Sequence, residues 1–178
     1  MKCSAGKSIA VHSPILFFAQ NRELAEEIKA THPEHLLVIA VLKGSFVFAA
    51  DLIRAMDEAG LVPEVEFMSL SSYLEGTVST GSVRVVHDIE GPVAGRDVLL
   101  VDDILESGRT LTYAKDLLMA RGARSVRTCV LLEKPGKRAI HLNPDHVGFT
   151  CPDLFVVGYG MDVAHNWRQL PFVGVIED

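Results

Sequence analysis

Residues 98–110 read Val-Leu-Leu-Val-Asp-Asp-Ile-Leu-Glu-Ser-Gly-Arg-Thr, and this stretch decides the fold. Four apolar residues lead into two adjacent carboxylates, Asp102 and Asp103, and Glu106 follows before a polar turn. A short apolar run that ends in a turn, with a helical pattern directly after it, is typical of a strand buried on both faces of a parallel sheet. Ligands of such sheets bind beyond the carboxyl ends of the strands. We therefore expect the three acids and the turn to lie in a binding site.

The turn after the acids consists of Ser107, Gly108, Arg109 and Thr110, and its chemistry suits a phosphate. Backbone N–H groups at a helix N-terminus lack partners within the helix, and the helix dipole favours an anion there. The glycine allows a close backbone approach, the two hydroxyls are further donors, and the arginine compensates negative charge. The two aspartates, when ionised, only accept hydrogen bonds, which suits sugar hydroxyls or a hydrated divalent cation. Together these groups indicate a phosphorylated ribose as ligand.

The composition of the chain restricts the class of protein. Its 178 residues, nearly half of them hydrophobic, predict one globular domain that spans residues 1–178. A net charge of −6 argues against nucleic acid as a partner. No apolar segment approaches the length of roughly 18 residues that a transmembrane helix needs, and no signal-peptide pattern is present. The three cysteines form no C-x-x-C pair, which disfavours a zinc or redox site. We therefore expect no membrane partner and a cytoplasmic location.

Apolar runs alternate with helical patterns along the chain, which predicts an α/β fold with a parallel sheet. No G-x-G-x-x-G follows any of the predicted strands, so a nucleotide-binding dehydrogenase is disfavoured. The expected helices cover residues 22–30, 45–59 and 111–120, and the expected strands cover residues 36–42, 65–70, 83–89, 126–132, 155–159 and 173–176, together with the motif strand that begins at residue 98.

The motif Val98–Thr110 resembles the phosphoribosyl-pyrophosphate (PRPP) motif of type I phosphoribosyltransferases, and the wider chain is similar to the hypoxanthine-guanine phosphoribosyltransferases. The alternative interpretation of this motif is a surface-exposed strand end followed by an N-capped helix without a binding function, which any α/β protein could show. The resemblance implies the type I phosphoribosyltransferase fold: a mainly parallel sheet flanked by helices, a small hood built from the chain ends, and a flexible lid loop at about residues 73–82. It also implies transfer of the 5-phosphoribosyl group from PRPP to a 6-oxopurine, with Mg²⁺ as cofactor and a homodimer or homotetramer as the assembly.

Two loops elsewhere in the chain match further parts of this family. Lys43 and Gly44 follow the strand expected at residues 36–42 and correspond to a pyrophosphate loop, in which the peptide bond before the lysine can be cis. Ser72 and Tyr73 open the segment that corresponds to the lid, which would exclude water from a reactive sugar. Taken without the resemblance, the first loop reads as an ordinary strand-to-helix turn and the second as a long hairpin connection.

The resemblance assigns the purine site to the last third of the chain. Lys134 would contact the 6-oxo oxygen and so favour a 6-oxopurine over adenine. Phe155 would stack on the ring, and Val156 would offer backbone groups to its edge. Asp162 would lie in this part of the site and help to hold the metal, and Arg168 would contact the pyrophosphate. The alternatives are a solvated lysine, a core phenylalanine and a surface ion pair of small energetic value.

The catalytic candidates are Glu106 and Lys134, with Glu106 as general base or as a group that orients the purine. Glutamate stands here where the family usually carries an aspartate, and a misplacement by about 1 Å can cost around a hundredfold in rate. Mg²⁺ would be held by Asp102, Asp103 and Asp162, and two metal ions are plausible for a pyrophosphate leaving group. Two alternatives stay open: a nucleotide-sensing regulator on the same fold that binds RNA, and the same enzyme with a preference for xanthine.

Overall fold

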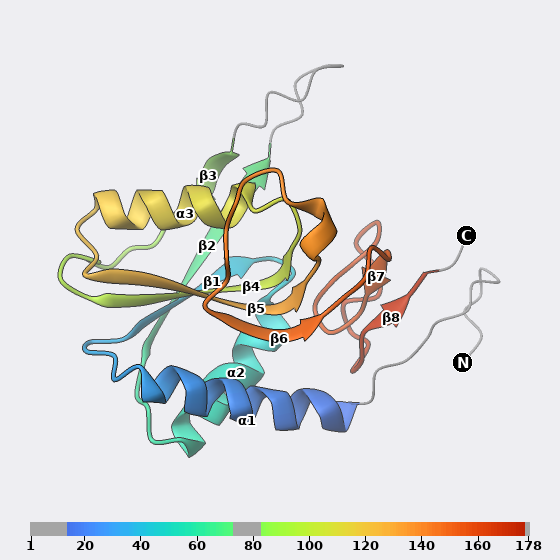
Figure 1. Cartoon of the computed structure of the whole chain (residues 1–178), viewed down its shortest axis with the longest axis horizontal. Helices are drawn as coiled ribbons and strands as arrows, with labels where there is room; N and C mark the ends of the chain where they lie inside the picture. The colour runs from blue at the N-terminus through green and yellow to red at the C-terminus, as the bar shows by residue number, and fades with distance from the viewer. Residues whose placement is uncertain (1–13, 73–82, 177–178) are drawn as a thin grey trace.

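The computed structural model of the protein describes residues 14–72 and 83–176. The centre of this described part is a six-stranded sheet with the strand order β3-β2-β1-β4-β5-β6 (Figure 1). All neighbouring strands are parallel except the edge strand β3, which pairs antiparallel with β2. The mainly parallel sheet predicted from the sequence is thereby confirmed. The strands are β1 (Leu37–Leu42), β2 (Glu64–Ser72), β3 (Val83–His87), β4 (Asp97–Leu105), β5 (Ser125–Glu133) and β6 (His146–Thr150).

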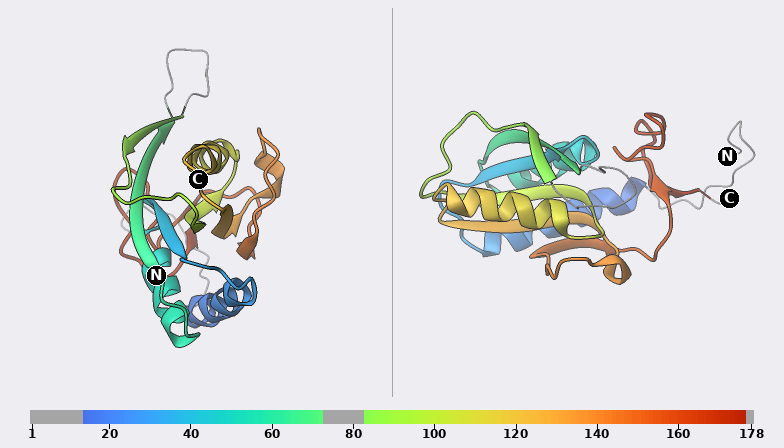
Figure 2. Two further views of the ribbon diagram at one scale, coloured as in Figure 1. Left: turned by 90° about the vertical axis from the view of Figure 1, so that its left-hand side faces the viewer. Right: turned by 90° about the horizontal axis from the view of Figure 1, so that it is seen from above.

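Helices cover both faces of the sheet, as Figures 1 and 2 show: α1 (Pro14–Ala30) and α2 (Phe46–Glu58) lie on one face and α3 (Arg109–Ala120) on the other. Two apolar clusters result, one on each face. In β1, Val38 and Ala40 belong to the cluster under α1 and α2, whereas Ile39 and Val41 belong to the cluster under α3. This alternation is the two-residue period of a strand that is buried on both sides.

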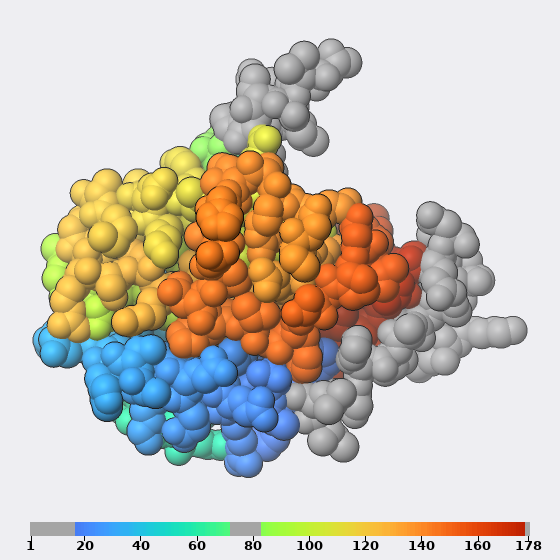
Figure 3. Space-filling view, viewed as in Figure 1, coloured from blue at the N-terminus to red at the C-terminus, as the bar shows by residue number. Residues whose placement is uncertain are grey.

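A small second sheet forms the described part of the hood. It pairs β7 (Val156–Val157) antiparallel with β8 (Gly174–Val175), and it lies beyond one end of the main sheet (Figure 2). The N-terminal residues 1–13, which the resemblance also assigns to the hood, are outside the described residues. In the space-filling view, α1 and the last third of the chain adjoin along one continuous surface (Figure 3). No helix within residues 14–72 and 83–176 is long and apolar enough to cross a membrane.

Several element boundaries differ from the expectation. Helix α1 begins at Pro14 instead of residue 22, because proline is favoured in the first helical turn and Phe17 packs into the core, where its ring stacks on Tyr159. The strand expected at residues 155–159 contains just two residues, since Gly158 and Tyr159 adopt positive φ values of 92° and 50° and turn the chain. Strand β6 was not predicted. The lid loop, Tyr73 included, is outside the described residues, and Ser72 is the last residue of β2.

Candidate active site

The predicted phosphate turn joins the end of β4 to the start of α3. Gly108 has φ +80°, and a Cβ atom there would lie 2.8 Å from the carbonyl oxygen of Ile140, so the turn requires glycine. The turn lines a pocket of about 170 Å³ together with Asp102 and Glu106. Arg109 is the first residue of α3 and is not among the residues that line this pocket. Except for that side chain, the turn is placed as the motif predicts.

The two adjacent acids occupy different sides of β4. Asp102 is only 8% exposed and lines the pocket beside the turn, whereas Asp103 lines a larger cavity. Burial raises the pKa of both carboxyl groups, and the charge of the neighbouring Asp103 raises that of Asp102 further. The ionised forms of both acids, which only accept hydrogen bonds, are therefore less favoured in the ligand-free protein than they would be in water. A bound cation or hydroxyl groups would favour the charged forms.

The predicted pyrophosphate loop packs closely against one of these acids. The Leu42–Lys43 peptide bond is cis, as the family resemblance implied. A Cβ atom on Gly44 would lie 1.7 Å from Oδ2 of Asp103, and one on Gly160 would lie 2.2 Å from the carbonyl oxygen of Gly44. Glycine at both positions lets the loop, the motif strand and the hood meet at one point.

Most of the predicted residues converge on one cavity of about 550 Å³, which lies where β1, β4 and β5 end and the hood begins. It adjoins the phosphate pocket, because Ile104 and Glu106 line both spaces. The predicted residues in its lining are Lys43, Gly44, Asp103, Glu106, Lys134, Phe155, Val156, Asp162 and Arg168.

In this cavity, Lys134 forms an ion pair with Glu106. The lysine is only 4% exposed, so the predicted solvated alternative does not hold for it. Phe155 is 57% exposed, which disfavours the core alternative and leaves its ring free to stack on a planar ligand. Val156 is buried in β7. The two catalytic candidates are therefore in direct contact, a relation that the sequence did not predict.

In the same cavity, Asp162 pairs with Arg168 over 2.5 Å between Oδ1 and Nη2. Oδ2 of Asp162 accepts a hydrogen bond from the N–H of His165 at 2.8 Å, and Nη1 of Arg168 donates to the carbonyl of Gly160 at 2.7 Å. Neither side chain is fully exposed, and both line the cavity, so the surface-pair alternative is disfavoured. Arg168 is thereby fixed beside the pyrophosphate loop.

The fit of a magnesium ion can be tested on these acids. Among residues 14–72 and 83–176, no group of three His, Cys, Asp or Glu side chains is placed to hold a metal. Mg²⁺ is usually bound through one or two carboxylates, water and substrate phosphates, not by an all-protein cage. Asp103 and Asp162 line one cavity and fit that partial role. Asp102 lies in the adjoining pocket instead.

A side-chain contact on the backbone of the phosphate turn was missed by sequence reasoning. Arg138 donates hydrogen bonds from Nη1 to the carbonyl oxygens of Leu105 and Glu106, both at 2.8 Å. A basic residue in a polar stretch after a strand carries no local signal for such a contact. It becomes visible only when the fold brings segments more than 30 residues apart together.

Comparison with known proteins gives concordant matches. The phosphoribosyl transferase domain matches residues 11–164. The hypoxanthine-guanine phosphoribosyltransferase of Bacillus subtilis is 44% identical over 155 residues, which cover 87% of this chain and 83% of that protein. Bifunctional TilS/HprT proteins of Listeria monocytogenes are 45% identical over 156 residues, and the chain spans just 23% of their length. A crystal structure of a hypoxanthine-guanine phosphoribosyltransferase from Bacillus anthracis, with HEPES in its active site, matches with TM-score 0.88 and 40% identity over 96% of this chain and 99% of that chain. The chain therefore belongs to the phosphoribosyltransferase family, among the hypoxanthine-guanine phosphoribosyltransferases.

Proposed function

We propose that the protein transfers the 5-phosphoribosyl group of PRPP to a 6-oxopurine, hypoxanthine or guanine, with release of pyrophosphate, as an enzyme of purine salvage. The observation that carries this proposal is the continuity of the two spaces at the ends of the parallel strands. A phosphate-sized pocket of about 170 Å³ opens beside a cavity of about 550 Å³, and Glu106 stands at their junction. A ligand with a phosphate at one end and a pyrophosphate and base at the other fits this arrangement.

The chemistry of the residues that line the pocket and the cavity suggests where each group of the substrate would bind. The turn with Ser107, Gly108 and Thr110 would bind the 5′-phosphate, aided by the dipole of α3. Asp102 and Asp103 would accept hydrogen bonds from the ribose hydroxyls. The pyrophosphate would lie between the Lys43–Gly44 loop and Arg168, whose guanidinium can bind two oxygens at once.

The purine would lie against Phe155, with its 6-oxo oxygen at the buried ammonium of Lys134. An ammonium group has three N–H donors, so Lys134 can keep its contact with Glu106 while it donates to the base. The 6-amino group of adenine is a donor and would leave the buried ammonium without an acceptor, which disfavours that base strongly. Glu106 would then accept the proton from N7 of the purine or orient the ring as the new glycosidic bond forms.

Mg²⁺ would supply charge neutralisation for the pyrophosphate leaving group when it is bound. Asp162 and Asp103 would hold it from the protein side, with the remaining ligands from substrate and water. This assignment is supported by the placement of the two carboxylates on the cavity wall beside Arg168.

Two further features belong to the proposal. We place the activity in a single domain of residues 1–178, because the main sheet and the hood share one cavity. A homodimer or homotetramer stays a prediction from the family. The regulator alternative gains no support from the acidic composition of the chain.

The test is an assay with PRPP, Mg²⁺ and each of hypoxanthine, guanine, xanthine and adenine, in which nucleotide and pyrophosphate are quantified. Product from hypoxanthine or guanine, and none from adenine, is the expected result. Product from xanthine alone would replace the proposed substrate. PRPP binding without turnover, combined with a mobility shift of RNA, would favour the nucleotide-sensing regulator instead.

A further inference from the structure

The segment that follows β5 lies against the phosphate turn at the end of β4. We call residues 134–140 the strap. Its first N–H group donates to the carbonyl of Leu105 at 3.0 Å, and the N–H groups of Ala139 and Ile140 donate to the carbonyl of Ser107 at 2.9 and 3.0 Å. The strap is therefore hydrogen-bonded to the turn through its backbone at both ends.

Between these two ends of the strap, the side chain of Arg138 also contacts the turn. Its Nη1 donates to the carbonyl oxygens of Leu105 and Glu106, both at 2.8 Å, and its Nη2 pairs with Oε1 of Glu133 at 2.6 Å. The arginine side chain is only 16% exposed. Because a guanidinium is planar and its donors have fixed directions, these three contacts determine its orientation.

The contacts of the strap determine how the peptide groups of the turn are oriented. In a trans peptide group, the carbonyl of one residue and the N–H of the next point in opposite directions. The carbonyls of Leu105, Glu106 and Ser107 all accept hydrogen bonds from the strap. The N–H groups that follow them, up to that of Gly108, are therefore directed away from the strap. The three residues that carry these N–H groups, Glu106, Ser107 and Gly108, all line the pocket of about 170 Å³.

We propose that Arg138 is a positioning residue that keeps the phosphate turn in its anion-binding orientation. The carbonyl of Leu105 also accepts from the strap backbone, and that of Ser107 accepts from two N–H groups, whereas the carbonyl of Glu106 accepts from Arg138. Loss of the guanidinium frees the peptide between Glu106 and Ser107 to rotate. Rotation would withdraw an N–H from the phosphate and present a carbonyl oxygen in its place, which repels an anion. This inference rests on the proposed function, since it assigns that pocket to the 5′-phosphate of the substrate.

The test compares Arg138→Met, which keeps an unbranched apolar stem but removes the guanidinium and all its donors, with Arg138→Lys. Arg22→Met is the matched control, because Arg22 on α1 forms an exposed ion pair with Glu58, the last residue of α2, and lines neither pocket. The dissociation constant of ribose 5-phosphate is measured by calorimetry, and KM values for PRPP and hypoxanthine by steady-state assay. Arg138→Met is expected to weaken ribose 5-phosphate binding and raise the KM for PRPP by roughly tenfold to a hundredfold, with the KM for hypoxanthine unchanged.

For Arg138→Lys, the dissociation constant of ribose 5-phosphate and the KM for PRPP are expected to lie between those of Arg138→Met and the wild type, because the ammonium group can still donate to the carbonyl of Glu106. Wild-type affinity for ribose 5-phosphate in folded Arg138→Met protein, or an equal rise of both KM values, would overturn the proposal. If Arg138→Met does not fold, Arg138→Lys and Glu133→Gln provide the same comparison with milder expected losses. A failure of the proposed function would give a different result, because the wild type would then bind ribose 5-phosphate but form no nucleotide. In that case, the comparison of ribose 5-phosphate binding between the variants would still decide the role of Arg138.

Discussion

Gly44 lies where the Lys43–Gly44 loop packs against Asp103 of β4, so its substitution tests whether the site depends on this close contact. A methyl group there would occupy the position of the Asp103 carboxylate, since the added Cβ would be 1.7 Å from Oδ2. Gly44→Ala is therefore expected to displace Asp103, to lower the free energy of unfolding by about 2 kcal/mol, and to raise the KM for PRPP at least tenfold. The measurements are urea denaturation and steady-state kinetics. Gly136→Ala is the control, because its added methyl would meet nothing within 4 Å; equal behaviour of the two variants would contradict the prediction.

Glu106 is the residue that we propose as the general base, at a position where the family usually carries an aspartate. Its carboxylate pairs with the buried Lys134, so the longer side chain is held in place by a specific contact. Glu106→Gln keeps the shape and removes the base, and we expect kcat to fall by about a hundredfold with little change in the KM for PRPP. Glu106→Asp keeps the carboxylate on a shorter side chain, and its kcat should lie between that of Glu106→Gln and that of the wild type. A glutamine variant with the kcat of the wild type would show that the reaction does not use this carboxylate.

At the scale of elements, the fold was predictable where the sequence pattern is local. The apolar runs of β1, β4 and β5 are continuous because both faces of these strands are buried, and the first residue of each strand was predicted to within one residue. Strand β6 was missed, since its five residues include His146 and Gly148 and show no apolar run. Gly148 is required there by a neighbour distant in sequence: a Cβ atom would lie 2.6 Å from the carbonyl oxygen of Leu131. Such pairings, like the contacts of Arg138, depend on the assembled sheet.

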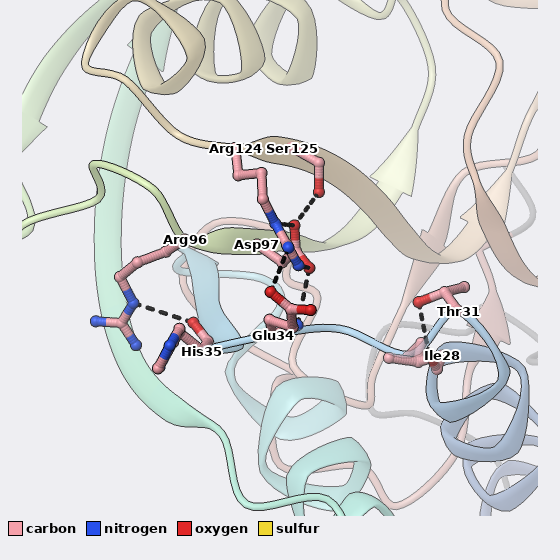
Figure 4. Close-up of polar contacts among 8 residues, drawn as sticks. All are labelled: Ile28, Thr31, Glu34, His35, Arg96, Asp97, Arg124 and Ser125. Carbon is pink, nitrogen blue, oxygen red and sulfur yellow. Dashed lines mark hydrogen bonds and ion pairs between the residues drawn. The ribbon is translucent and has the colours of Figure 1, made fainter.

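At the opposite ends of these strands from the active site, a cluster of charged side chains connects the start of β4 to its neighbours (Figure 4). Asp97, the first residue of β4, accepts hydrogen bonds from Arg124 and Ser125 at the start of β5 and from the N–H of Glu34 before β1. It therefore ties three neighbouring segments together. The carboxylate is 5% exposed, and its hydrogen bonds with Arg124 hold its pKa well below the ordinary value of 3.8.

The sign of the pH dependence follows from this lowered pKa. A depressed carboxyl pKa stabilises the folded state fully above the unfolded value, and the contribution is lost as the pH falls below 3.8 toward the folded value. Asp97→Asn is expected to lower the free energy of unfolding at pH 7 by about 2 kcal/mol, and its difference from the wild type should shrink between pH 4 and pH 2. Urea denaturation across this range measures both effects, with Asp116→Asn, exposed on α3, as control. A pH-independent difference would contradict the assignment.

Across the whole molecule, β4 connects two ends of opposite electrostatic character. It begins with a carboxylate whose pKa is lowered by a partner and approaches its end with two whose pKa values are raised by burial. Perturbed acids of the second kind are typical of functional sites, where the fold tolerates a local cost that substrate binding relieves. The charges that stabilise the sheet and the acids that we propose as ligand contacts are therefore separated along one strand.

This separation predicts that the binding site is a source of instability in the free protein. Because the pKa of Asp102 is raised in the folded state, the folded protein binds more protons than the unfolded chain, and stability falls as the pH rises from 3.8 through the folded value. Asp102→Asn should remove this cost, raise the free energy of unfolding of the ligand-free protein at pH 8 by about 1 kcal/mol, and leave it nearly unchanged at pH 4. The same substitution should reduce the stabilisation by PRPP and Mg²⁺, since that gain depends on ligand affinity. Thermal unfolding of both proteins, with and without PRPP, at the two pH values separates the effects. A variant that is less stable than the wild type at pH 8 without ligand, yet equally stabilised by PRPP, would mean that Asp102 serves the fold and not the substrate.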